Sequence, residues 1–253
     1  MDGLNQANLR FDEICEGMTL AQFSDGFSYG TDAVLLAAFA DVRAGSRGCE
    51  LGTGTGIVPI LMFRHKKCSH ITALEIQPEY AALAAQNAAN CGFSDRIKVI
   101  EGDLKDDSLL KQIGELDFVV SNPPYMKTST GYLNENPKKL IARHEIHCDI
   151  RDVCRGASKL LRHGGEFFVI YRPDRLPDLI CALRENSLEP KLIIPVSAGE
   201  GKPPVLILCR AKKHGGAEMK LAAPFIIESP DGQPSRAMRQ VYDSGRMEIS
   251  VRK

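Results

Sequence analysis

The sequence lacks the features of a membrane or exported protein. None of its apolar runs approaches the roughly 20 residues that a helix needs to span a bilayer. Its amino-terminal segment, MDGLN, has no basic region followed by an apolar stretch, so a signal peptide is not expected. From these absences we expect a cytoplasmic protein.

The sequence also lacks a CxxC pair, although it contains 8 cysteines. Most of them lie in apolar or mixed segments, where a thiol behaves as a small hydrophobic group. His144, His147 and Cys148 have a helical i, i+3, i+4 spacing that could hold zinc, but no second pair of ligands accompanies them. We therefore predict reduced cysteines and no metal site.

A net charge of either sign is absent, because 32 basic residues balance 32 acidic ones. Binding to nucleic acid needs a basic surface, so any such surface must be local. Two clusters are candidates, and both are equally compatible with ordinary solvated charges. They are Arg236, Arg239, Arg246, Arg252 and Lys253, and Lys127, Lys138, Lys139 and Arg143.

What the sequence does contain is a regular alternation of predicted strands and helices. The predicted strands cover residues 48–51, 71–76, 97–100, 116–121, 166–171, 192–196 and 205–209. The predicted helices cover 32–39 (with Thr31 as its cap), 57–65, 78–89, 106–113, 138–161 and 175–185, and Gly164-Gly165 is expected to end the fifth. This pattern predicts an α/β, Rossmann-like fold: a mainly parallel seven-stranded sheet with helices on both faces and an antiparallel edge strand.

The two ends of the chain fall outside this alternation. Residues 18–23 and 27–29 flank a Ser-Asp-Gly turn and predict a hairpin. We divide the chain into an amino-terminal hairpin or extension (1–30), a main domain (31–213) and a carboxyl-terminal extension (214–253). The last is expected to pack on or near the substrate face.

A glycine loop follows the first strand of the main domain. Gly52, Gly54 and Gly56 have GxGxG spacing, and Ile57 stands where the dinucleotide fingerprint GxGxxG has its last glycine. This spacing disfavours NAD. It suits a ligand whose amino-acid tail lies across the loop, where glycine lets the backbone approach closely.

Acidic residues at the ends of the next two strands extend this pattern. Glu75 is placed to accept hydrogen bonds from both hydroxyls of a ribose. Asp103 is placed to accept from an adenine amino group, with Leu104 packing on the ring. Three such features in order on successive strands predict an adenosine site, in which we include Glu50 of the loop. Asp32 is a candidate partner for the ammonium group of the ligand, or simply an acid at a helix start.

The fourth strand runs into Asn122-Pro123-Pro124-Tyr125, which we call the proline corner. Two prolines cannot continue a central sheet ladder, but they stiffen a turn and fix the direction of its carbonyl groups. An NH2 group on a conjugated ring or amide is a poor nucleophile, because its lone pair is delocalised. Asn122 Oδ1 and the Pro123 carbonyl can accept its two hydrogens, and Tyr125 can stack on the flat acceptor group.

Together, these residues resemble the class I amino-methyltransferases. Over residues 8–245 the chain is similar to the bacterial adenine-N6 methyltransferases that modify the anticodon-adjacent adenine of tRNA(Val); segments 27–36, 142–145 and 224–242 extend the match. The resemblance implies S-adenosylmethionine as the cofactor, held by Asp32, Glu50, the glycine loop, Glu75, Asp103, Leu104 and Asn122. It implies tRNA as the partner, with Asn122, Pro123 and Tyr125 in catalysis. It also implies that Arg143 and His144 lie near the mouth of the site.

Other functions share parts of this pattern. A protein-glutamine methyltransferase or an rRNA amino-methyltransferase would carry the same corner, although the former normally has a helical amino-terminal domain. A catalytically idle RNA-binding member would not need an intact Asn122. The sequence does not indicate an oligomeric state.

Overall fold

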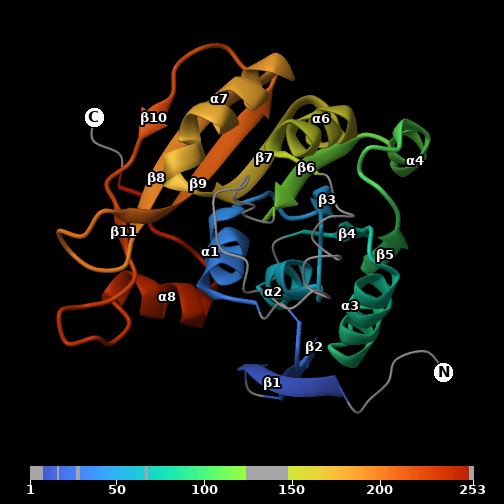
Figure 1. Ribbon diagram of the computed structural model, residues 1–253, viewed down its shortest axis with the longest axis horizontal. Coiled ribbons are helices and arrows are strands. Elements are labelled where there is room, and N and C mark those ends of the chain that lie inside the picture. Colours follow the sequence, from blue (N-terminus) through green and yellow to red (C-terminus); the bar gives the residue numbers. More distant parts are fainter. Residues whose placement is uncertain (1–7, 16, 27–28, 66–67, 124–147, 251–253) are drawn as a thin grey trace, which may run out of the picture.

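The computed structural model describes residues 8–15, 17–26, 29–65, 68–123 and 148–250. One large sheet carries helices on both faces, and a separate two-stranded hairpin lies below it in the view of Figure 1. The strands are β1 (Leu9–Cys15), β2 (Met18–Phe23), β3 (Arg47–Leu51), β4 (His70–Glu75), β5 (Ile97–Glu101), β6 (Leu116–Ser121), β7 (Leu161–Tyr171), β8 (Leu188–Ser197), β9 (Pro204–Lys213), β10 (Lys220–Leu221) and β11 (Phe225–Ile226). The helices are α1 (Thr31–Phe39), α2 (Ile57–Arg64), α3 (Pro78–Asn90), α4 (Asp107–Ile113), α6 (Ile150–Leu160), the short 3-10 helix η2 (Pro173–Arg175), α7 (Leu176–Glu185) and α8 (Arg236–Ser244).

The longer strands of the large sheet lie in the order β8-β9-β7-β6-β3-β4-β5. β3 pairs in parallel with β4 and β6, whereas β9 runs antiparallel to both of its neighbours, β7 and β8. The predicted fold, a mainly parallel sheet with helices on both faces and an antiparallel strand towards one edge, is therefore confirmed. The seven longer strands match the predicted number, and the short β10 and β11 bring the sheet to nine strands. β9 is the second strand from that edge, since β8 lies outside it and the short β10 and β11 add to β8 in parallel.

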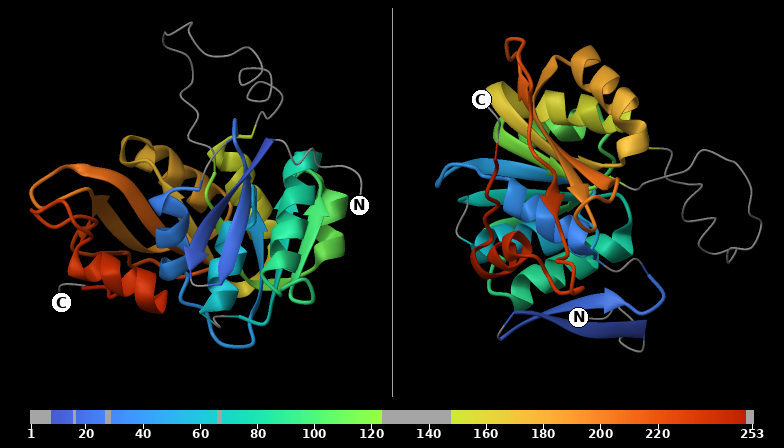
Figure 2. Two further views of the ribbon diagram at one scale, coloured as in Figure 1. Left: turned by 90° about the horizontal axis from the view of Figure 1, so that it is seen from below. Right: turned by 90° about the vertical axis from the view of Figure 1, so that its left-hand side faces the viewer.

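Two hydrophobic layers bury the sheet. Phe118 and Val120 of β6 pack in the cluster that includes α1, α2 and α3, whereas Val119 packs in the cluster with α4, α6 and α7. Figure 2 shows helices on both sides of the sheet. Successive side chains of a strand point to opposite faces, so a strand covered on both sides has consecutive apolar residues, as at 118–120. Close packing requires glycine at position 48 of β3, because a Cβ there would lie 2.2 Å from the Phe118 ring.

The structure corrects the predicted helix over 138–161. α6 begins at Ile150, because the Asp149 side chain accepts from the N–H of Asp152 at 3.0 Å and Asp152 accepts from the N–H of Asp149 at 3.3 Å. This reciprocal cap fixes a helix start. The helix ends at Leu160, and the next residues enter β7 directly, so Gly164-Gly165 lies within a strand. Residues 138–147 lie outside the described part of the chain.

The amino-terminal hairpin is also different from the predicted one. β2 pairs antiparallel with β1, which precedes it. Residues 27 and 28 of the predicted second strand lie outside the described part of the chain. The turn contains Gly17 with a φ of +75°, a conformation that glycine adopts without strain. β1 was not predicted, because only the pairing with β2 makes this segment a strand.

The carboxyl-terminal extension folds back on the main sheet. α8 buries Met238 and Val241 in the cluster that also contains α1. Ser235 caps its start and Gly245 its end. The domain boundaries stay a prediction. None of the helices in the described ranges is long and apolar enough to cross a membrane.

Candidate functional site

Four parallel strands end at the same level and form what we call the carboxyl edge. Leu51 of β3 lies opposite Leu74 of β4 and Ser121 of β6, and Glu75 lies opposite Glu101 of β5. The Ser121 hydroxyl donates to the Leu51 carbonyl at 2.9 Å and locks this register. The segments that follow these strands therefore meet at one edge, where ligands bind in open α/β sheets.

The glycine loop turns at this edge through three left-handed residues. Gly52, Gly54 and Gly56 have φ values of +75°, +56° and +82°. A Cβ on Gly52 or Gly54 would meet nothing within 4 Å, so backbone conformation, not crowding, requires glycine there. The space beside these two residues is open. Gly56 is crowded as well, since its Cβ would lie 3.3 Å from the Ala84 side chain of α3.

Glu75 connects the loop to the second strand. Its carboxylate accepts from the backbone N–H of Gly54 at 2.9 Å and of Gln77 at 3.0 Å. Burial raises the pKa of Glu75 above its ordinary value, and the bonds from Gln77 and Gly54 oppose that shift. The structure thus places Glu75 against the loop, where the sequence predicted a ribose acceptor.

Glu50 lies deeper, beneath the loop. Its side chain is 1% exposed and accepts a hydrogen bond from the Thr53 hydroxyl. Burial raises the pKa of Glu50 well above its ordinary range, and the nearby Glu75 raises it further. The structure therefore gives Glu50, a predicted cofactor residue, a contact within the loop. Its hydrogen bond with Thr53 stabilises the conformation of the loop.

Asp103 and Leu104 follow β5 as predicted. Asp103 Oδ1 accepts from the N–H of Lys105 at 2.8 Å, and its other oxygen lies 3.9 Å from the Lys105 ammonium. Leu104 is half-buried next to Gly156 of α6, where a Cβ would lie 3.6 Å from the Leu104 side chain. The tighter approach is to the Leu104 carbonyl, which would lie 3.3 Å from that Cβ, so glycine at 156 leaves room for the backbone of this segment.

Asn122 makes the long-range contact that unites the site. Its Nδ2 donates to Asp32 Oδ2 at 2.9 Å, across 90 residues of sequence. The other Asp32 oxygen accepts from the N–H of Ala33 at 2.9 Å. Asp32 therefore binds the proline corner and the start of α1 together. The prediction of Thr31 as the helix cap is wrong: Gly30 occupies that position, and no side chain among the described residues caps the start of α1.

Several predicted site residues fall outside the described ranges. Pro123 is buried directly after Asn122, but Tyr125, Lys127, Lys138, Lys139, Arg143, His144 and His147 are not described. Within the described residues, no group of three His, Cys, Asp or Glu side chains could hold a metal ion. Cys148, the third residue of the spacing that was set aside as a zinc site, has its pKa raised to about 12, chiefly by burial.

Asn87 of α3 is a site-supporting residue that the sequence did not reveal. Its fully buried amide donates to the carbonyls of Ala21 and Thr55, each at 2.9 Å, and accepts from the N–H of Ala21 at 2.9 Å. It thereby ties the hairpin to the glycine loop. A polar residue within an alanine-rich helix was the available signal.

Comparison with known proteins agrees with this geometry. The methyltransferase small domain family matches residues 22–180. A protein of Porphyromonas gingivalis (strain ATCC BAA-308 / W83), named tRNA1(Val) (adenine(37)-N6)-methyltransferase, is 38% identical over 59% of this chain and 60% of its own. A protein of the same name from Flavobacteriaceae bacterium (strain 3519-10) is 32% identical over 67% of this chain and 70% of its own. The chain thus spans about three fifths of the first relative.

Among solved structures, one described as a predicted O-methyltransferase from Agrobacterium tumefaciens has a TM-score of 0.70. It is 23% identical and covers 86% of this chain and 98% of its own, which shows a shared fold. The predicted fold class and family are both confirmed. On the extent of these matches, the chain belongs to the methyltransferase small domain family, together with the relatives named tRNA1(Val) (adenine(37)-N6)-methyltransferase.

Proposed function

We propose that this protein transfers a methyl group from S-adenosylmethionine to the exocyclic amino group of an adenine in tRNA, forming N6-methyladenosine. The observation that carries the proposal is the position of Asn122, at the same edge as the glycine loop and Glu75 and bonded to Asp32. The names of the matched relatives support both the reaction and the substrate.

The cofactor site is proposed at the glycine loop, with Glu75, Asp103 and Leu104 around the nucleoside. The loop suits such a ligand, because the space beside Gly52 and Gly54 is open and their backbone faces it without side chains. Glu75 is a buried carboxylate whose oxygens accept from backbone N–H groups and have further lone pairs for ribose hydroxyls. When bound, the cofactor supplies an electrophilic methyl group on a positively charged sulfur.

The chain's own contribution to the chemistry is to hold the target amine. Asn122 Nδ2 donates to Asp32, and the amide oxygen of Asn122 is the proposed first acceptor for the target NH2 group. The Pro123 carbonyl supplies the second acceptor. Two acceptors on the two hydrogens draw the nitrogen lone pair out of conjugation and direct it at the methyl group. Catalysis then rests on positioning and charge complementarity, without a general base before attack.

The tRNA substrate is the finer part of the proposal, and the cytoplasmic location goes with it. A protein-glutamine or rRNA amino-methyltransferase would use the same corner. Exposed arginines on and after α8, Arg236, Arg239 and Arg246, offer a basic surface among the described residues.

The proposal is tested by incubating the protein with labelled S-adenosylmethionine and, separately, with total tRNA, total rRNA and a cell protein extract. Mass spectrometry of nucleoside digests should find N6-methyladenosine in tRNA alone. If the label appears in rRNA or in protein glutamine, the proposed substrate is wrong and the proposed enzyme class is right. Absence of cofactor binding by calorimetry, with NAD bound instead, would overturn the proposal.

A further inference from the structure

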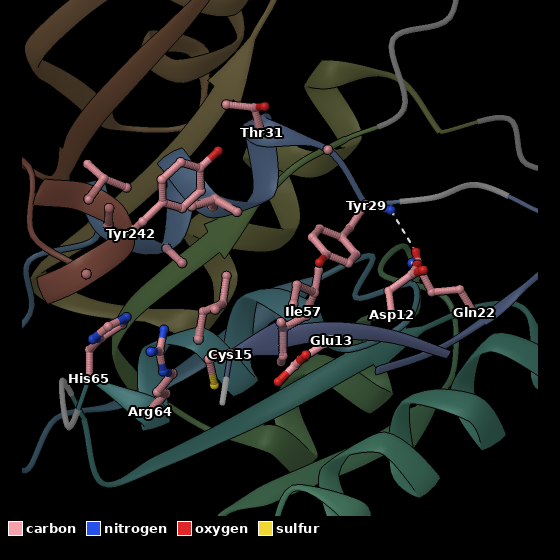
Figure 3. A pocket seen from close by; sticks show the side chains of 18 of the residues that line it. Asp12, Glu13, Cys15, Gln22, Tyr29, Thr31, Ile57, Arg64, His65 and Tyr242 are labelled. Atoms are coloured by element: carbon pink, nitrogen blue, oxygen red, sulfur yellow. Dashed lines mark hydrogen bonds between the residues drawn. The ribbon is translucent and has the colours of Figure 1, made fainter. Parts of the chain in front are cut away.

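A hollow lies between the β1–β2 hairpin, α1, α2 and α8 (Figure 3). Its volume is about 640 Å³, within the range of small-molecule sites. Its floor is apolar and comes from α1 and α2, with Val34, Ala37, Ala38, Ile57 and Leu61. Segments from both ends of the chain therefore enclose one space that neither could form alone.

Two tyrosines stand on opposite sides of this hollow (Figure 3). Tyr29 precedes α1, and Tyr242 lies on α8 with 44% of its surface exposed. The pKa of Tyr29 is raised, first by burial and then by the proximity of Asp12 and Tyr242. Two rings that face one space are suited to stack on a flat ring between them.

The polar lining carries both signs of charge. Arg64 and His65, at the end of α2, face Asp12 and Glu13 of β1 across the hollow. Asp12 also accepts from Arg10 at 3.1 Å and from the Gln22 amide. A simple anion would meet two carboxylates, and an apolar molecule would strip water from the charged groups at a cost. A nucleotide fits better, because it combines a flat base, hydrogen-bond donors and one phosphate.

The hollow adjoins the proposed catalytic corner on two elements. Its lining residue Thr31 precedes Asp32, which is bonded to Asn122. Its lining residue Ile57 directly follows Gly56 of the glycine loop. A strand whose target base lies at Asn122 can therefore continue into the hollow.

We propose that this hollow binds an unpaired nucleotide of the RNA substrate, next to the target adenine; this inference rests on the proposed function. The base would lie between Tyr29 and Tyr242, and the phosphate would lie near Arg64. Aromatic platforms combined with cations are the usual means of holding unpaired bases. The hollow would thus select RNA in which the target lies in a loop.

The first test measures methylation of a hairpin RNA that carries the target adenine in its loop. Tyr242→Ala and Tyr29→Ala should each raise KM for the RNA roughly 5- to 150-fold, the loss expected for one stacked base. The value of kcat at saturating RNA and the cofactor Kd should stay unchanged, and Tyr242→Phe should restore KM. Unfolding curves of each variant check that the fold is intact.

Salt dependence tests the phosphate contact. Arg64→Ala should reduce the slope of log K against log salt by roughly 0.7, the release from one phosphate of a single strand. Arg43→Ala is the matched control, because Arg43 is an exposed arginine that does not line the hollow. An equal slope in the wild type and in Arg64→Ala contradicts the phosphate contact.

Coupling tests which nucleotide occupies the hollow. Two hairpins are compared, one with an abasic residue before the target adenine and one with it after. For the wild type, KM should rise with one of these two hairpins and not with the other. At that position Tyr242→Ala should add little, because both changes remove the same contact. Additive effects, or tyrosine variants with unchanged KM on an RNA that the wild type methylates, would overturn the assignment of the hollow. A wild type that methylates no RNA would instead overturn the proposed function, and a direct binding measurement with the same hairpins would still test the hollow.

Discussion

The two halves of the candidate site are assembled differently along the chain. The proposed cofactor half, comprising the glycine loop, Glu75, Asp103 and Leu104, comes from residues 50–104 at three neighbouring strand ends. The substrate half comprises Asn122, Asp32 and the hollow, and it draws on the amino-terminal hairpin, α1, α2 and α8. The first is a property of one continuous stretch of sheet, whereas the second exists only where distant segments meet.

This difference indicates that the two halves are separable in function. A change in the cofactor half should weaken cofactor binding and spare RNA affinity, and a change in the substrate half should do the reverse or affect turnover alone. Asp32 is the residue at which the two accounts compete, because the sequence assigns it to the cofactor and the structure bonds it to Asn122. The variants below test this separation, from the largest expected effect to the smallest.

Asn122→Ala should produce the largest loss. It removes one of the two acceptors that hold the target amine, and kcat should fall by roughly 100- to 1,000-fold. Cofactor affinity, measured by calorimetry, should change little, and Asn90→Ala, at an exposed amide on α3, is the control. Near-normal turnover in a folded Asn122→Ala protein would show that the proline corner is only a rigid turn and does not activate the amine.

Glu75→Ala should break the cofactor half alone. The loss of hydrogen bonds to a carboxylate should weaken cofactor binding by about 1.5–3 kcal/mol. The Kd for RNA should be unchanged, and Glu79→Ala, at an exposed acid in the first turn of α3, should leave both affinities intact. A variant that loses RNA binding and keeps cofactor binding would contradict the division of the site.

Asp32→Ala and Asp32→Asn decide between the two roles of this residue. If Asp32 positions the Asn122 amide, the alanine variant should lose roughly tenfold in kcat with cofactor Kd unchanged, about the value of one charge-assisted hydrogen bond. Asparagine keeps an acceptor for Asn122 Nδ2 and should restore most of the turnover. If both variants instead weaken cofactor binding, the negative charge serves the ligand's ammonium group.

Glu50→Gln should have the smallest effect, visible in the pH dependence of stability. Burial raises the folded-state pKa of Glu50 above the ordinary value of 4.5, so its contribution to stability is present below that pH and is lost as pH rises towards the folded pKa. The free energy of unfolding, measured with urea between pH 4.5 and 8, should therefore fall less in Glu50→Gln than in the wild type. Glu101→Gln, at an exposed acid, should follow the wild type, and a parallel fall in Glu50→Gln would show that Glu50 is ionised in the folded protein.

Sequence reasoning succeeded where the signal is local. Residues 116–121 form a buried strand, because the apolar run from Phe118 to Val120 must be covered on both faces. Gly52, Gly54 and Gly56 form the turn that their spacing predicted, since their positive φ values favour glycine. The predicted helix over 138–161 missed the helix start at Ile150, because the cap formed by Asp149 and Asp152 resembles an ordinary polar stretch within a helix.

The sequence by itself determined the order of strands and helices, the loop and the acids at the strand ends, because each depends on neighbours within a few residues. Only the tertiary structure decided that β1 pairs with β2, that Asn87 reaches Ala21 across 66 residues, that Asp32 holds Asn122 across 90, and that α8 closes the hollow. No local pattern encodes these contacts. They form because the folded layers bring together polar groups that, once buried, must find partners.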